Sequence, residues 1–168
     1  ICAQRLLLLN FKTYPRSREY VSLVQKKMAR LVCYIHVGAL DASITQPIVD
    51  ELISRLRHSG LYDKLECIRC GIVGRDKDMI HLPEKAQVVF FNDNPSVYEI
   101  PTLNNMRDYA VNNQDAYFLY LHTKGATNKR CNGVNYQVEW SRLMQHFCID
   151  RHEECIELLN NYKTVGCL

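Results

Sequence analysis

The sequence predicts an α/β protein in which helices cover a largely parallel β-sheet. Short apolar runs rich in branched and aromatic residues alternate along the chain with segments whose apolar residues recur at helical spacing. The predicted order is strand, helix, strand, strand, helix, strand, helix, strand. This alternation is typical of a layered fold in which crossover helices connect parallel strands.

Four apolar runs predict the strands of this sheet. Each has the length of a buried strand, and their branched and aromatic residues suit a sheet that is covered on both faces. The run from Ala116 to His122 is the most pronounced, because it is aromatic or aliphatic almost throughout. The predicted strands cover residues 29–36, 64–74, 86–92 and 116–122, and a further apolar run covers residues 164–168.

Residues 44–58 predict the first helix, because apolar residues recur there at helical spacing. Thr45 is its expected N-cap, Pro47 suits the first turn, and Gly60 is a natural stop signal. A second helix is predicted over residues 101–110, which also place apolar residues on one face.

The longest helical pattern covers residues 134–160, and Trp140, Leu143 and Phe147 contribute to its apolar face. A lone tryptophan in an amphipathic helix is usually a core anchor. We therefore expect one continuous helix with Trp140 packed in the core.

Composition limits the class of protein. A chain of 168 residues with 47% hydrophobic and 23% charged residues suits one folded domain and argues against disorder. The net charge of +3 is too small to indicate a dedicated nucleic-acid binder. The longest apolar run, residues 6–9, is far shorter than the ~18–20 residues of a membrane span. The N-terminal residues also lack the order of a signal peptide, so we expect a cytoplasmic or other intracellular protein.

The eight cysteines fit this expectation. Cys33 and Cys148 lie inside apolar patterns, where free cysteine packs as a small hydrophobic residue. Cys67 and Cys70 form a CxxC, but it lies within a strand pattern, which would place the two side chains on opposite faces. Because a redox CxxC begins a helix and a zinc site needs further ligands, we expect neither role.

Three loops follow the predicted strands, and ligands of open α/β sheets bind beyond the carboxyl ends of strands. One of them, from His122 to Gly125, offers an imidazole, a hydroxyl, the Lys124 ammonium and a flexible glycine. These groups suit a phosphate or diphosphate, although the loop could also be a solvated basic segment. It is not a Walker A sequence, and no GxGxxG follows the first strand.

The other two loops contain His36 and Asp93. His36 ends the first strand and precedes Gly38, where it could face a nucleoside or merely cap the strand end. Asp93 could accept a hydrogen bond from a ribose or help to hold a cation. Equally, it could be a turn residue before Pro95.

Several segments together resemble a known family. The chain resembles small GT-A-type glycosyltransferase domains of large algal DNA viruses and various microbes, over residues 29–168, with residues 1–28 as an extension outside the resemblance. The most specific pieces are Tyr98–Leu103 (YEIPTL) and Tyr120–Gly125 (YLHTKG). The other pieces, in order along the chain, are Tyr34–His36, Ser59–Tyr62, Gly71–Gly74, Trp140 and Thr164–Gly166.

The resemblance implies a Rossmann-like GT-A sheet sandwiched by helices. It also implies an enzyme that transfers a sugar from a nucleotide-diphosphate sugar to a hydroxyl of a glycan or glycoprotein acceptor. The alternative is a non-catalytic nucleotide-binding remnant of such an enzyme. Catalytic residues are not identified, and the residues expected to bind the donor are His36, Gly38, Asp93, Thr102, His122, Thr123, Lys124 and Gly125.

This sequence departs from the family pattern at its metal site. GT-A enzymes usually carry a DxD motif where this chain has His122-Thr123-Lys124. Lys124 could neutralise the diphosphate directly, or a divalent ion (Mn or Mg) could be held by the phosphates together with Asp93 or Asp115. The family also continues beyond a strand like residues 164–168 into an acceptor-binding region, so we expect this part to be missing.

Overall fold

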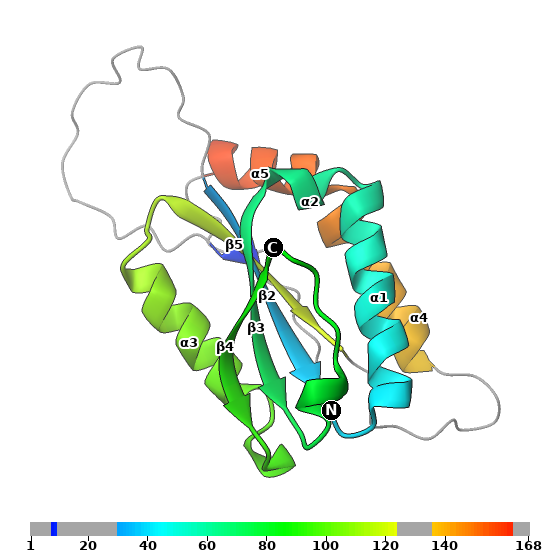
Figure 1. Cartoon of the computed structure of the whole chain (residues 1–168). Helices are drawn as coiled ribbons and strands as arrows, with labels where there is room; N and C mark the ends of the chain where they lie inside the picture. Colours follow the sequence, from blue (N-terminus) through cyan, green and yellow to red (C-terminus); the bar gives the residue numbers. More distant parts are fainter. Residues whose placement is uncertain (1–7, 10–29, 124–135, 163–168) are drawn as a thin grey trace.

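The computed structural model describes residues 8–9, 30–123 and 136–162, and its centre is a five-stranded sheet. The strands lie in the order β1-β5-β2-β3-β4 (Figure 1). Four of them, β2 to β5, pair in parallel, and β1 joins the free edge of β5 in the antiparallel direction. The predicted α/β class with a largely parallel sheet is therefore confirmed. The strands are β1 (Leu8–Leu9), β2 (Arg30–Gly38), β3 (Leu65–Val73), β4 (Ala86–Asn92) and β5 (Ala116–His122).

Helices cover both faces of the sheet, and Figure 1 shows α3 on one side with α1 and α4 on the other. None of the helices among the described residues combines the length and the hydropathy needed to cross a membrane. The helical elements are α1 (Ala42–His58), α2 (Leu61–Lys64), α3 (Ile100–Val111), α4 (Tyr136–Gln145), a π-helical segment η3 (His146–Asp150), α5 (His152–Asn161) and the short 3₁₀ turns η1 (Lys77–Met79) and η2 (Pro95–Val97).

Strand β2 shows why its sequence is apolar without interruption. Cys33 and Ile35 point into a core formed with α1, η3 and α5, whereas Val32 and Tyr34 point into a second core formed with α3. All four side chains are fully buried. Because successive residues of a strand point to opposite faces, a strand covered on both sides must be apolar at every position.

The first helix begins earlier than its apolar spacing predicts. Asp41 is the N-cap, and its carboxylate accepts a hydrogen bond from the Ser43 backbone N–H at 3.0 Å. The prediction of Thr45 as N-cap is wrong: Thr45 lies inside α1, and its hydroxyl donates to the Gly38 carbonyl at 2.8 Å. Apolar spacing marks the buried face of a helix but does not distinguish between two residues that can both cap it.

The predicted continuous helix over residues 134–160 is broken. α4 ends at Gln145, a π-helical turn follows, and α5 then departs in a different direction (Figure 1). A π-helical turn contains more residues than an α-helical turn and therefore changes which residues face the core. Cys148 and Ile149 are buried, whereas Trp140 is 48% exposed, so the expectation that Trp140 anchors the core is wrong.

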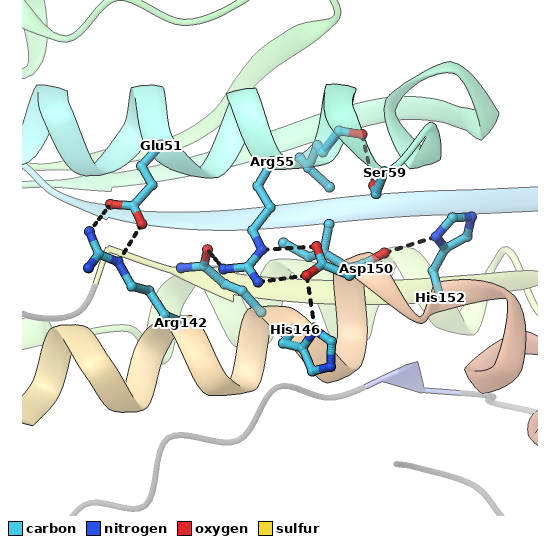
Figure 2. Close-up of polar contacts among 10 residues, drawn as sticks. Glu51, Arg55, Ser59, Arg142, His146, Asp150 and His152 are labelled. Carbon is cyan, nitrogen blue, oxygen red and sulfur yellow. Dashed lines mark hydrogen bonds and ion pairs between the residues drawn. The ribbon is translucent and has the colours of Figure 1, made fainter.

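Ion pairs attach this broken helix to α1 (Figure 2). Arg55 of α1 donates to both carboxylate oxygens of Asp150, at 2.9 and 2.6 Å, and His146 Nδ1 lies 3.1 Å from the same carboxylate. One turn away along α1, Glu51 accepts from Arg142 at 2.8 Å. Asp150 is the last residue of η3, so the π-helical turn places its carboxylate where Arg55 can reach it.

Candidate functional site

The carboxyl ends of β2 and β5 bring together two of the predicted site residues. His36 and His122 are register partners on these adjacent parallel strands. Their ring centroids lie 4.9 Å apart, and the ring planes are nearly perpendicular, at 78°. The two histidines therefore make an edge-to-face contact at the sheet edge where α/β proteins bind ligands.

Thr102, another predicted site residue, joins this pair from α3, which covers the face of the sheet toward which His36 points. It lies in the first turn of α3 and is fully buried, and its Oγ1 is 2.9 Å from Nδ1 of His36. Gly71 of β3 makes this approach possible, because a Cβ at Gly71 would lie 2.1 Å from Thr102 Oγ1. Gly71 was not among the predicted site residues, although it begins the Gly71–Gly74 segment and a glycine inside a strand pattern often marks a close approach.

His36 carries no charge at neutral pH. Its side chain is only 4% exposed, and this burial lowers the pKa to about 3, with a smaller contribution from His122. A neutral imidazole has one N–H donor and one acceptor nitrogen. Nδ1 is occupied by Thr102, and Nε2 is the other polar atom of the ring.

Thr123 and Gly38 hold the ends of β2 and β5 together. The Gly38 N–H donates to Thr123 Oγ1 at 2.9 Å, and the Thr123 N–H donates to the His36 carbonyl at 3.0 Å. The Gly38 carbonyl accepts the Thr45 hydroxyl. Thr123 and Gly38 are thus close to the histidine pair, and these hydrogen bonds, all within the protein, position the edge.

The two candidate metal ligands lie at opposite ends of the sheet. Asp93 follows β4 at the carboxyl edge and is exposed, and β3 separates its strand from β2. Asp115 precedes β5 at the amino edge, 3.5 Å from Arg30. The structure therefore does not bring Asp115 to the histidine pair. Lys124 and Gly125, the other two predicted residues, lie outside the described residues.

Three further residues, which were not among the predicted site residues, lie close to them along the chain. Tyr120 is on β5, two residues before His122, and so shares its face of the sheet. Burial raises the pKa of the Tyr120 hydroxyl. The negative charge of Glu99, which directly precedes α3, raises it further. Tyr98 has φ 50° and ψ −146°, a backbone conformation that residues other than glycine rarely adopt. Alternation along the strand could have identified Tyr120, but no local signal marks the strain at Tyr98.

The CxxC cysteines take no part in this site. As predicted, Cys67 and Cys70 face opposite sides of β3, since Cys70 belongs to the core under α1 and Cys67 packs against the core under α3. Burial raises the pKa of Cys70 to about 12 and also raises the pKa of Cys67. Both thiols are therefore protonated near neutral pH, which favours a packing role.

Comparison with known proteins gives no match: no protein-family model, no curated protein and no solved structure resembles the chain significantly. Functional assignment therefore rests on the geometry of the carboxyl edge and on the sequence motifs that form it. That edge places the neutral imidazole of His36 beside a second histidine, an arrangement suited to hydrogen-bonding a polar organic ligand.

Proposed function

We propose that this protein binds a nucleoside-diphosphate sugar at the carboxyl edge of its sheet and transfers the sugar to an acceptor hydroxyl, as GT-A-type glycosyltransferases do. The single observation that supports this most is the contact of His36 with both Thr102 and His122. These residues come from the YEIPTL and YLHTKG segments and from the end of β2, which are the parts of the chain that resemble this family. The Rossmann-like GT-A architecture belongs to the same proposal.

In this proposal the charged and uncharged parts of the donor bind different groups. The neutral His36 suits the nucleoside, whereas Lys124, which directly follows Thr123, suits the diphosphate. The main catalytic task is to stabilise the leaving diphosphate, since negative charge develops on it as the glycosidic bond breaks. A preorganised cation is effective at that point.

In this proposal the described residues do not hold a metal ion by their side chains alone. They contain no group of three or more His, Cys, Asp or Glu side chains placed to bind one. Asp93 is exposed, and Asp115 is at the other end of the sheet. We therefore assign no catalytic step to a metal.

Nucleotide binding without sugar transfer is the second candidate function. It is favoured by the chemistry of His36, a buried titratable group at this edge. With a pKa of about 3, this imidazole cannot act as a proton carrier near neutral pH. It can still hydrogen-bond to a ligand.

A thermal-shift screen tests donor binding directly. UDP-glucose, UDP-N-acetylglucosamine and GDP-mannose are added separately to the full chain, with and without MnCl₂. A ligand that binds only the folded protein raises the unfolding temperature. We expect one donor to do so, and we expect Lys124→Ala to reduce the shift. Asp108→Asn, an exposed change on α3, is the control and should leave the shift unchanged.

Release of the nucleoside diphosphate in the presence of glycan acceptors separates the two candidate functions. Acceptor-dependent release supports the transferase, whereas binding without release supports the nucleotide-binding module. If no donor changes the unfolding temperature, both candidates are wrong.

A further inference from the structure

Tyr120 has an unusual hydroxyl. Its side chain is only 5% exposed, and its oxygen is buried with no hydrogen-bond partner among the described residues. A buried hydroxyl without a partner has lost its hydrogen bonds to water and gained none in return, so it destabilises the fold. Such groups are rare in native proteins, and each one requires an explanation.

The neighbouring buried tyrosines show that this fold can satisfy such hydroxyls. Tyr34 is the register partner of Tyr120 on β2, and its hydroxyl contacts Asn105 Oδ1 at 3.1 Å and accepts from Arg69 Nε at 2.7 Å. The Tyr117 hydroxyl, on the other face of β5, donates to Asn160 at 2.8 Å. The free hydroxyl of Tyr120 therefore differs from its neighbours on the same sheet.

The position of Tyr120 connects it with the candidate site. Its side chain lies on the same face of the sheet as those of His36 and His122, one alternation step before the carboxyl edge. It is also close enough to the Glu99 carboxylate, at the start of α3, to be affected by its charge. Because the hydroxyl is buried, a ligand at the histidine pair and the start of α3 must insert a polar group below the surface of this edge to reach it.

We propose that the Tyr120 hydroxyl is a ligand-binding group, which hydrogen-bonds to an uncharged polar group of the bound nucleotide sugar, on its base or one of its sugar rings. This inference rests on the proposed function and adds to it which part of the donor lies over β5. The ligand supplies the missing partner, so the hydroxyl is satisfied only in the complex.

The electrostatics around the Tyr120 hydroxyl favour binding of an uncharged group over binding of a phosphate. His36 is neutral, and burial together with Glu99 keeps the Tyr120 hydroxyl protonated. Glu99 is negatively charged and acts on this hydroxyl, so it would repel a phosphate bound there. A hydroxyl or a ring amide of the ligand meets no such repulsion, because it carries no charge.

Tyr62 provides a matched control. Its hydroxyl is also buried and lacks a partner among the described residues. It lies in α2, which leads into the amino end of β3, and it belongs to the core on the other face of the sheet. Both variants delete a tyrosine hydroxyl oxygen. Tyr120→Phe deletes it beside the candidate site, and Tyr62→Phe deletes it away from the site.

The test measures stability and affinity for the full chain and both variants. Without ligand, we expect each variant to unfold at or above the wild-type temperature, because each loses a hydroxyl that has no partner. Affinities are then measured by calorimetry for the UDP- or GDP-sugar that stabilises the wild type, and for pyrophosphate. We expect Tyr120→Phe to weaken binding of the nucleotide sugar about tenfold and to leave pyrophosphate binding unchanged. Tyr62→Phe should affect neither.

Each of the other outcomes overturns a defined part of the inference or of the proposed function. Equal affinity of wild type and Tyr120→Phe for the nucleotide sugar overturns the role of Tyr120 and leaves the proposed function intact. Equal weakening of pyrophosphate binding overturns the assignment to an uncharged group. A marked loss of stability in ligand-free Tyr120→Phe means that the hydroxyl has a partner in the free protein, which also overturns the inference. If no donor binds the wild type, the proposed function and this inference are both wrong.

Discussion

Gly71 of β3 leaves the space that Thr102 of α3 occupies. A Cβ at Gly71 would lie 2.1 Å from Thr102 Oγ1 and 2.9 Å from its Cβ, so the start of α3 could not stay where it is. Thr102 is also the hydrogen-bond partner of His36, the register neighbour of Gly71 on β2. The absence of one side chain thus allows a helix, a strand and a histidine to meet.

Gly71→Ala is therefore expected to destabilise the fold by about 1–3 kcal/mol, the range for overpacking a close-packed core. It should also weaken donor binding, because α3 must move away from His36. Urea unfolding and calorimetry measure the two effects. Thr102→Gly removes all three atoms that the new Cβ would meet, so the double variant should lose less stability than the two single changes add up to. Strict additivity would contradict the steric explanation.

His36 should make stability depend on pH in a defined window. The unfolded histidine has the ordinary pKa of 6.5, and burial lowers the folded value to about 3. Below pH 6.5 the unfolded chain gains a proton that the folded protein does not accept, so folding stability falls with falling pH. Between these two values the loss approaches about 1.4 kcal/mol for each pH unit.

The measurement compares urea unfolding of wild type and His36→Gln between pH 6.5 and pH 5. This range lies above the ordinary pKa of carboxylates, and the difference between the two proteins cancels the other histidines. We expect the free energy of unfolding to change less with pH in His36→Gln than in the wild type. The same slope in both would mean that His36 is accessible to protons in the folded state.

Tyr98→Gly should make the folded protein more stable. Its φ of 50° with ψ of −146° is a region that glycine adopts without strain, and the side chain is 66% exposed, so few contacts are lost. Relief of the strain, offset by the greater freedom of glycine in the unfolded chain, should give a net gain of roughly 1 kcal/mol. Tyr98→Ala keeps the Cβ and should show no such gain in the free energy of unfolding. A loss of stability in Tyr98→Gly would indicate that the tyrosine ring itself holds the turn.

The Arg55–Asp150 pair should contribute modestly to stability. Arg55 lowers the pKa of Asp150 by hydrogen bonding, and His146 adds to this effect. The Asp150 side chain is 35% exposed, so solvent screens the pair, and Asp150→Asn is expected to destabilise the fold by only about 1 kcal/mol.

Asp108→Asn is the matched control, because Asp108 pairs with Arg107 while both side chains are largely exposed. Its effect on the free energy of unfolding should be close to zero. A double-mutant cycle with Arg55→Gln isolates the coupling between Arg55 and Asp150. A coupling indistinguishable from zero would show that η3 docks on α1 without this pair.

The sequence by itself determined four strands and two helices of this fold, and the placement of two candidate site residues. Apolar patterning depends on which sides of an element are buried, so continuous apolar runs located β2, β3, β4 and β5, and helical spacing located α1 and α3. Parallel strands end at a common edge, and for this reason His36 and His122 could be placed together without knowing their geometry. The proposed GT-A function remains a prediction that depends on short motifs within these elements.

Only the tertiary structure decided how these elements meet. The His36–Thr102 contact joins residues 66 positions apart, and the space at Gly71 matters only because α3 crosses β3 there. Likewise, a helical pattern over residues 134–160 does not reveal the break at η3, where Asp150 meets Arg55 of α1. These features depend on the packing of one element against another, whereas periodicity reports the environment of each element alone.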